Sequence, residues 1–392
     1  MAAKEISYKM STAGYIKLIL SAILIFGISI GACGTETTFY VSPSGRDTNN
    51  GSIRTPFRTL GKAVQSARLH KSGGKPARIV LRQGIYYMES TVALDARYSG
   101  LTIEAMKREN VVLSGGRVVT GWKPYRGKIV QADISGLNLP SYAFRELYYN
   151  DMRQPLARVP NFDPRHPRTG GFAYNAEIAE KGGTTKLRYR PEDMDPSKWT
   201  HTERALVDIF PGYNYGNDIR PLKSTDTSAR ILEIGPGATY ELGIGDRYFV
   251  KNVFEELDAP GEWYCDPDKK VLYFQPPDDN LAKSSVVVPA LDSIFDIKGD
   301  SKTGNLAERI RISGLDMRDT IGTAITVIAA RDCFVTACAF RNVTTAVSLG
   351  DETHDCRIAG CDITQTGGAG IVLTGTPGEH QRVSHHVIDN NY

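Results

Sequence analysis

Three six-residue segments decide the fold of this chain: Ile312-Ser-Gly-Leu-Asp-Met317, Val335-Thr-Ala-Cys-Ala-Phe340 and Ile358-Ala-Gly-Cys-Asp-Ile363. Their first residues are 23 positions apart, and a fourth copy, Val387-Ile-Asp-Asn-Asn-Tyr392, begins 29 positions after the third. A second series of apolar pairs has nearly the same rhythm: Ile325 and Val327, Val347 and Leu349, and Ile371 and Leu373. Two series that share a period predict stacked coils.

Alternation within these segments predicts which side chains face inward. Successive side chains of a strand point to opposite faces, so equivalent positions form a ladder through the stack. The predicted inward ladders are Ile312/Val335/Ile358, Leu315/Cys338/Cys361 and Met317/Phe340/Ile363, with Tyr392 assigned to the last. The pattern favours an all-β fold, a right-handed parallel β-helix (solenoid), over a leucine-rich repeat, whose consensus is absent.

The N-terminus has the pattern of a secretory signal, predicted over residues 1–33. Lysines at positions 4, 9 and 17 precede an apolar run, Leu18 to Ile30, which is too short to span a bilayer comfortably. The run ends in Gly-Ala-Cys33, which resembles a lipobox. Either Cys33 is lipidated or this is an ordinary signal peptide with an incidental cysteine. We expect export to the periplasm, the outer membrane or the medium.

Composition restricts the partners. The net charge of +3 is small, and residues 304–392 contain no lysine, with seven arginines against ten acidic residues. This balance favours neither nucleic acid nor a membrane surface, apart from the lipid anchor, and disfavours an electrostatic grip on polyanions. We expect a monomer without cofactor or metal.

Five cysteines follow Cys33, and four of them form two aligned pairs at ladder positions: Cys333 with Cys356, and Cys338 with Cys361. Stacked neighbours come within disulfide range, but parallel in-register side chains point the same way. Free, buried thiols are therefore favoured over disulfides and over a metal site.

Local patterns divide the chain into parts. Residues 38–121 contain a predicted capping helix, which begins at Thr55-Pro56 and places Leu60, Ala63, Val64 and Ala67 on one face, followed by the first coils. The coil rhythm is lost over residues 122–289, which predicts an inserted β-rich domain, including a hairpin within 262–274. Residues 290–392 hold the later coils.

Two groups of motifs carry a resemblance to known proteins. Tyr40-Val-Ser-Pro-x-Gly-x-Asp47 and Thr55-Pro-Phe-x-Thr-Leu-x-Lys-Ala63 resemble the opening of many exported β-helix proteins. Leu147-Tyr-Tyr-Asn-Asp-x-Arg-Gln-Pro-Leu-Ala-Arg-Val-Pro-Asn161 and Gly261-Glu-Trp-Tyr-x-Asp266 are similar to the inserted region of glycoside hydrolase family 141. The resemblance implies hydrolysis of glycosidic bonds in complex polysaccharides, with α-L-fucosidase and xylanase among the activities of that family.

Candidate binding residues are weaker signals. Asp316, Asp362 and Asn391 occupy one predicted outward ladder, and Asp319, Asn342 and Gln365 another, which line a sugar groove or simply a solvated face with turns. His385 and His386 beside Asp389 contact a substrate or end a surface loop, and Tyr213 and Tyr215 stack on sugars or pack the insertion. No catalytic residue is assigned.

Two further functions remain open. A polysaccharide lyase would require clustered aspartates for Ca²⁺ and an Arg or Lys base, whereas a noncatalytic glycan-binding or scaffold solenoid needs no special residues. The fourth copy also ends within a coil, at Tyr392, and the family's catalytic carboxylates lie on later coils. We therefore expect a chain truncated at its C-terminus, without turnover on fucosides or xylans.

Overall fold

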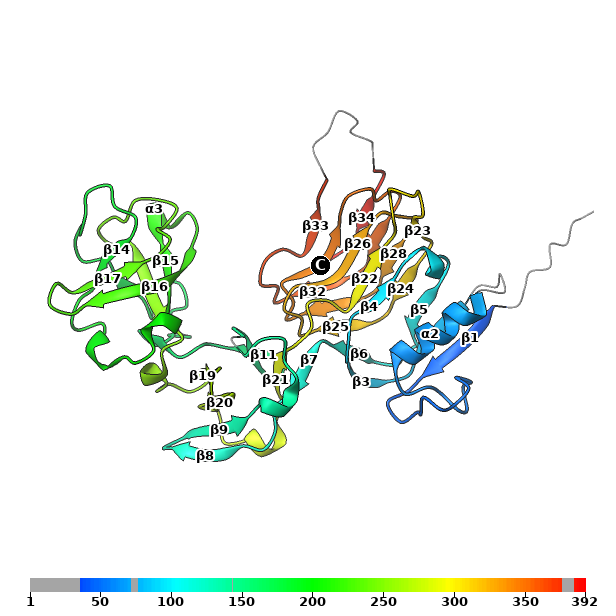
Figure 1. The fold of residues 1–392 in the computed structure, drawn as a ribbon, viewed down its shortest axis with the longest axis horizontal. Coiled ribbons are helices and arrows are strands. Elements are labelled where there is room, and N and C mark those ends of the chain that lie inside the picture. Colours follow the sequence, from blue (N-terminus) through cyan, green and yellow to red (C-terminus); the bar gives the residue numbers. More distant parts are fainter. Residues whose placement is uncertain (1–35, 72–76, 143, 376–383) are drawn as a thin grey trace, which may run out of the picture.

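The structure, a computed structural model, describes residues 36–71, 77–142, 144–375 and 384–392. The predicted signal and Cys33 lie outside these ranges. Within them the chain is mostly β (Figure 1). Its helices are α2 (Leu60–Lys71), the short α3 (Pro211–Asn214) and the 3-10 turns η1 (Ala96–Tyr98), η2 (Ser135–Leu137), η3 (Pro196–Lys198), η4 (Thr202–Arg204), η5 (Phe254–Glu256) and η6 (Leu281–Lys283). No helix of the described ranges is long and apolar enough to cross a membrane.

Three parallel sheets fill the right half of Figure 1. The first contains β1 (Thr37–Val41), β2 (Ala77–Leu81), β5 (Thr102–Ala105), β24 (Arg311–Ser313), β28 (Phe334–Thr336), β31 (Arg357–Ala359) and β34 (Val387–Asp389). The second contains β3 (Gly84–Tyr87), β6 (Val111–Ser114), β25 (Asp316–Arg318), β29 (Ala339–Arg341) and β32 (Asp362–Thr364). The third contains β33 (Ile371–Leu373), β30 (Thr345–Leu349), β26 (Thr323–Ile328), β22 (Phe295–Lys298) and β4 (Val92–Leu94), and β23 (Ala307–Glu308) pairs with β27 (Ala330–Arg331).

The first three predicted segments pair in the expected register. Ile312 lies opposite Val335, which lies opposite Ile358, and the next sheet aligns Met317, Phe340 and Ile363. These side chains belong to one hydrophobic core that also contains Leu315, Cys338 and Cys361. All five cysteines of the described ranges are free and buried, as the parallel register requires. The second apolar series also pairs as predicted, Ile325 with Val347 and Val347 with Ile371.

The fourth segment is shifted by one residue from the prediction. Ile388, not Val387, lies opposite Ile358, so Asn391 takes the ladder position of Cys361 and Tyr392 lies opposite Asp362. Asn391 fits there because its amide accepts a hydrogen bond from the Cys361 N–H (3.0 Å) and donates to the Ile358 carbonyl (3.0 Å). Tyr392 is exposed rather than inward, and Asn391 is not part of the outward ladder of Asp316 and Asp362.

The predicted capping helix begins later than expected. Leu60, Ala63, Val64 and Ala67 are buried on one face of α2, as predicted. However, Asp47 accepts hydrogen bonds from the backbone N–H groups of Arg58 and Thr59 (2.9 Å each), and the Thr59 hydroxyl accepts one from the Lys62 N–H (3.2 Å). These bonds supply the cap, so the helix starts at Leu60 and not at Thr55-Pro56.

Three antiparallel sheets lie between β6 and β22 in the sequence. One contains β11 (Met152–Gln154), β10 (Leu147–Tyr149), β21 (Val286–Pro289) and β7 (Gly116–Val118). Another contains β19 (Trp263–Asp266), β20 (Val271–Phe274), β9 (Ile129–Asp133) and β8 (Lys123–Arg126), with the predicted hairpin as β19 and β20. The largest contains β12 (Arg158–Val159), β18 (Arg247–Lys251), β15 (Leu206–Phe210), β16 (Asp218–Asp226), β17 (Ile231–Ile234) and β14 (Lys186–Arg188), with β13 (Ala173–Tyr174) beside β18.

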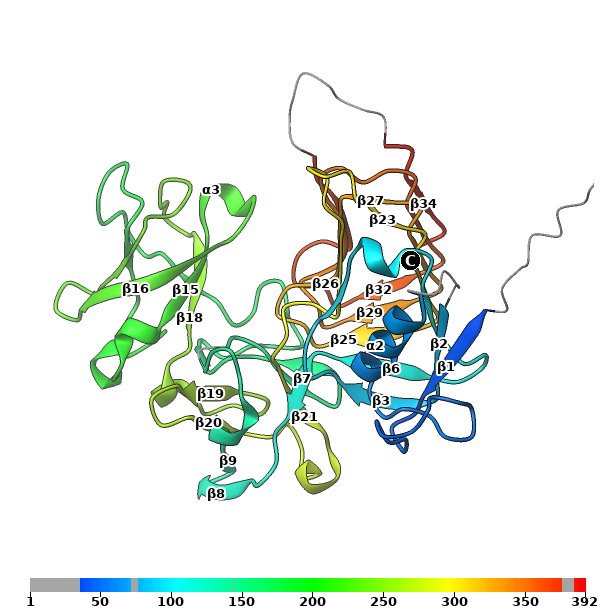
Figure 2. The same cartoon turned by 45° about the vertical axis from the view of Figure 1, so that its right-hand side comes forward.

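The antiparallel sheets have hydrophobic cores of their own. Figures 1 and 2 show the largest of them far from the parallel sheets, with the two smaller ones between. Because β24 and β25 pair directly with β5 and β6, the antiparallel region leaves the parallel stack after β6 without breaking its pairing. A junction therefore forms where this region returns against the stack.

Candidate functional site

A cavity of about 220 Å³ lies at this junction, and we call it the junction pocket. The second parallel sheet forms one wall, and the turn between β10 and β11 forms another. The lining residues are Ile85, Tyr87, Ser114, Asn150, Asp151, Ser285, Val287, Arg318 and Asp319.

The sheet wall comes from the alternation of short strands. Tyr87, Ser114 and Arg318 are opposite one another on β3, β6 and β25, so their side chains project from one face. The residues that precede them, Leu113 and Met317 among them, point into the core. Tyr87 is 41% exposed, and its ring is therefore available to a ligand.

The turn wall depends on two residues with positive φ, Asn150 (48°) and Asp151 (65°). Asn and Asp tolerate this conformation in tight hairpin turns better than other side chains with a Cβ. The side-chain amide oxygen of Asn150 accepts a hydrogen bond from the Ser285 N–H (3.0 Å), and the Asp151 carboxylate forms an ion pair with Arg318. The Asn342 amide also donates to the Asp151 carbonyl (2.9 Å), so the turn is held against the parallel sheet.

Asp319 follows β25 at a left-handed position (φ 60°) and is buried. Its carboxyl accepts hydrogen bonds from the Ser114 hydroxyl (2.7 Å) and the Asn342 amide (3.4 Å). Burial raises the pKa of Asp319 to about 6, and these hydrogen bonds and Arg318 offset only part of that effect. The carboxyl therefore changes protonation state near neutral pH.

The outward surface beyond the pocket is incompletely hydrogen-bonded. Asp316 is half-buried, burial raises the pKa of its carboxyl, and Arg341 approaches one oxygen at 3.3 Å. Within the described part of the chain, the other Asp316 oxygen, the Arg341 Nε and the Asn342 side-chain oxygen have no hydrogen-bond partner. Buried polar atoms rarely remain unpaired, so water molecules can complete these hydrogen bonds.

Together these groups offer an exposed ring, charge-paired side chains and hydroxyl and amide groups around one small cavity. Groups of these kinds have the chemistry to contact the apolar and hydroxyl faces of a polyol. No group of three or more His, Cys, Asp or Glu side chains in residues 36–71, 77–142, 144–375 and 384–392 is placed to hold a metal ion.

Of the candidates from the sequence, Asp319 lines the junction pocket, whereas the histidines and the other acidic candidates lie elsewhere. His385 lies near Asp355 (3.8 Å), and both ring nitrogens of the half-buried His386 contact groups just before the neighbouring strand β31, the Thr353 hydroxyl (3.2 Å) and the Cys356 N–H (3.2 Å). Asp389 forms an ion pair with Arg357 (2.8 Å) on the outer surface of the first parallel sheet. These contacts are those of a coil surface.

The remaining candidates lie elsewhere. Asp362 is exposed on β32, in the same outward row as Asp316 but two strands away. Tyr215 is exposed at the end of α3, which connects β15 and β16 of the largest antiparallel sheet and lies far from β3 and β25 in Figure 1. The side chain of Tyr213 is outside the described set.

The sequence did not predict most residues of the junction pocket as binding residues. Asn150 and Asp151 belong to the motif that resembles the inserted region of the hydrolase family, and Asp319 belongs to an outward ladder that was a candidate for a sugar groove. Arg318 and Tyr87 had no signal beyond their outward strand positions.

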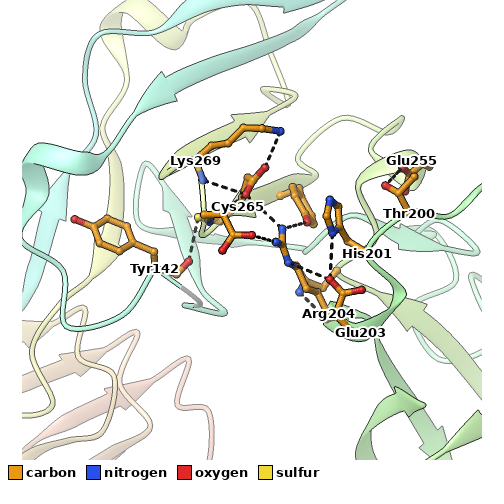
Figure 3. Close-up of polar contacts among 12 residues, drawn as sticks. Tyr142, Thr200, His201, Glu203, Arg204, Glu255, Cys265 and Lys269 are labelled. Carbon is orange, nitrogen blue, oxygen red and sulfur yellow. Dashed lines mark hydrogen bonds and ion pairs between the residues drawn. The ribbon is translucent and has the colours of Figure 1, made fainter. Parts of the chain in front are cut away.

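Other residues of the insertion motif have structural roles. The buried Glu262 carboxylate accepts hydrogen bonds from the backbone N–H groups of Arg158, Asp258 and Ala259 (3.2 Å each). Arg204 on η4 forms an ion pair with Asp266 of β19 (3.3 Å), and Lys269 in the turn of the same hairpin forms another (3.0 Å). Figure 3 shows Arg204 and Lys269 in this group of polar contacts. These contacts fix the hairpin and join neighbouring sheets.

Comparison with known sequences gives a short match. No family model matches the chain. An uncharacterized protein of Bacillus subtilis, YwoF, is 30% identical over 116 residues, which are 28% of this chain and 23% of that protein. The match thus spans less than a quarter of the curated relative.

Solved structures give the wider match. A structure described as a glycoside hydrolase superposes with a TM-score of 0.73 at 20% identity, covering 86% of this chain and 67% of the other, so the two share a fold. A complex of XylC with xylose reaches a TM-score of only 0.31 at 12% identity, over 91% of this chain and 65% of the other.

Proposed function

We propose that this chain is a carbohydrate-active protein of glycoside hydrolase type, and that the junction pocket binds a sugar of its substrate. The observation that carries the proposal is the exposed Tyr87 ring beside Asp151, Arg318 and Asp319 in one cavity. The fold shared with a glycoside hydrolase supports the class of protein, and the motif resemblance supports its reaction type.

The proposal includes a right-handed parallel β-helix as the scaffold. Support comes from three parallel sheets, whose strands follow one another in rotation along the chain, and from a single core between them. In such a scaffold every coil repeats the same outward face, which makes a long polar surface beside the inserted sheets.

We assign sugar binding, rather than bond cleavage, to the pocket residues. Glycoside hydrolysis uses two carboxyl groups, one as acid and one as base or nucleophile. Both Asp319 oxygens already accept hydrogen bonds, and Asp151 is ion-paired with Arg318. Two carboxyl groups against one guanidinium favour a neutral sugar over a uronate.

The test is a panel of soluble polysaccharides. The purified full chain is run through gels that contain xylan, fucosylated xyloglucan or polygalacturonate, and reducing sugar release is measured in parallel. We expect retardation by a neutral glycan, weakened at least tenfold in Asp151→Ala because Arg318 loses its partner, and unchanged in the exposed control Asp279→Ala. Retardation without sugar release would establish a glycan-binding protein instead of a hydrolase. No retardation, or an equal effect of both variants, would refute glycan binding at the junction pocket.

Export through the N-terminal signal, with lipidation of Cys33, is a separate proposal that rests on the sequence alone. Cys33→Ser should move the protein from the membrane fraction to the soluble fraction and stop incorporation of labelled palmitate, because the thioether would be lost. A wild-type protein that is already soluble and unlabelled would contradict the anchor.

A further inference from the structure

A second cavity, of about 400 Å³, lies between the start of α2 and strands β3 and β4, and we call it the cap cavity. Its walls include Pro43, Arg58, Thr59, Tyr87, Glu89 and Ser90. No candidate residue from the sequence lies in it.

The cap cavity adjoins the junction pocket. Ile85 and Tyr87 line both cavities, and these two apolar side chains are 46% and 41% exposed. Both project outward from β3, which is the edge strand of the second parallel sheet. The two cavities therefore meet along one strand.

The chemistry of the cap cavity suits a neutral ligand. Arg58 and Glu89 bring opposite charges, and Thr59 and Ser90 bring hydroxyl groups. The N-terminus of α2 disfavours an anion, because the Asp47 carboxylate lies beside it and accepts the N–H groups of Arg58 and Thr59, and the Thr59 hydroxyl accepts that of Lys62. Beside these polar groups stand the exposed Ile85 and Tyr87, which can cover the apolar face of a sugar ring.

We propose that the two cavities are neighbouring subsites of one groove, with the Tyr87 ring as the platform between them, so that the ligand is an oligosaccharide of at least two neutral sugar units. This inference rests on the proposed function. In addition, residues beside the N-terminal helix α2 would determine how many sugar units of the oligosaccharide are bound.

Calorimetric titration of the full chain with xylose, xylobiose and xylotetraose tests the inference. We expect the wild type to bind xylotetraose about fivefold more tightly than xylose, since stacking contributes roughly 1 kcal/mol and a tenfold change is about 1.4 kcal/mol. Tyr87→Ala should abolish this ratio, and Tyr87→Phe should retain it. Tyr215→Ala, which removes an exposed tyrosine far from the groove, should leave it unchanged.

The outcomes separate this inference from the proposed function. Equal affinities for xylose and xylotetraose, or an unchanged ratio in Tyr87→Ala, would overturn the second subsite. The proposed function would then stand as long as Asp151→Ala still weakened binding. Failure of the wild type to bind any of the three sugars would overturn both.

Discussion

Asp319 shows how a single side chain links the fold to the pocket. It ends β25 in a left-handed turn, receives hydrogen bonds from the Ser114 hydroxyl and the Asn342 amide, and still has a pKa raised to about 6 by burial. Position and spacing in the sequence indicated a turn residue on an outward ladder. They did not indicate its burial, because Ser114 is 205 positions away in the chain.

The raised pKa predicts a pH dependence of stability. The folded state binds the Asp319 proton more tightly than the unfolded state, whose pKa is 3.8, so the free energy of unfolding falls as pH rises from about 4 to about 6 and then stays low. The loss is roughly 3 kcal/mol for a shift of this size. Asp319→Asn should remove this part of the slope, measured by urea unfolding at pH 4 and pH 7.5. An identical slope in both proteins would show that the carboxyl ionises freely.

The hydrogen bonds of Glu262 lead to a second prediction for a single residue. Its carboxylate is the partner of three backbone N–H groups, and burial raises its pKa to about 7. Glu262→Ala would leave these buried donors unpaired, which should cost about 3–5 kcal/mol of unfolding free energy. Denaturant unfolding would measure the loss, with the exposed Glu241→Ala as control. A similar, small effect of both variants would refute a structural role for this motif residue.

At the scale of elements, the apolar spacing predicted the strands of the coils well, because each ladder repeats the same short pattern at a fixed interval. It failed by one residue at β34, where Asn391 replaces a cysteine and supplies its own hydrogen bonds to the neighbouring coil. The start of α2 was also missed, because its cap, Asp47, comes from a separate turn. The local apolar pattern thus predicts the bounds of helices and strands, except where a polar side chain hydrogen-bonds to backbone groups at the end of an element.

The ladder register can be tested in β31. Ile358 is buried between Val335 and Ile388, whereas its neighbour Arg357 points outward toward Asp389. Ile358→Asp would bury an unpaired charge and should cost several kcal/mol, while Arg357→Ser removes only a surface ion pair, worth about 0–1 kcal/mol. Thermal melting would compare the two. Equal melting temperatures would contradict the assignment of Ile358 to the core and Arg357 to the surface.

At the scale of the whole molecule, the candidate site arises from an insertion that returns against the parallel sheets. The turn at Asn150 and Asp151 lies between β10 and β11 of an antiparallel sheet, and Arg318 lies on β25 of the second parallel sheet. The motif at residues 147–161 contains this turn. The residue that holds the turn could not be predicted, since the Asp151 carbonyl and the Asn342 amide that donates to it are 191 positions apart. Candidates chosen for residue type alone, such as His385, His386 and Tyr215, fell on separate surfaces.

Hydrogen–deuterium exchange of the full chain, with and without the neutral polysaccharide that retards it, tests most directly whether the junction pocket binds glycan. The account predicts slower exchange in peptides that cover residues 147–153 and 314–320, because a bound sugar would hold the turn and the end of β25 together. Peptides that cover 211–217 and 384–389 should exchange at unchanged rates. Protection of either of those two segments, with none at the junction pocket, would contradict the account.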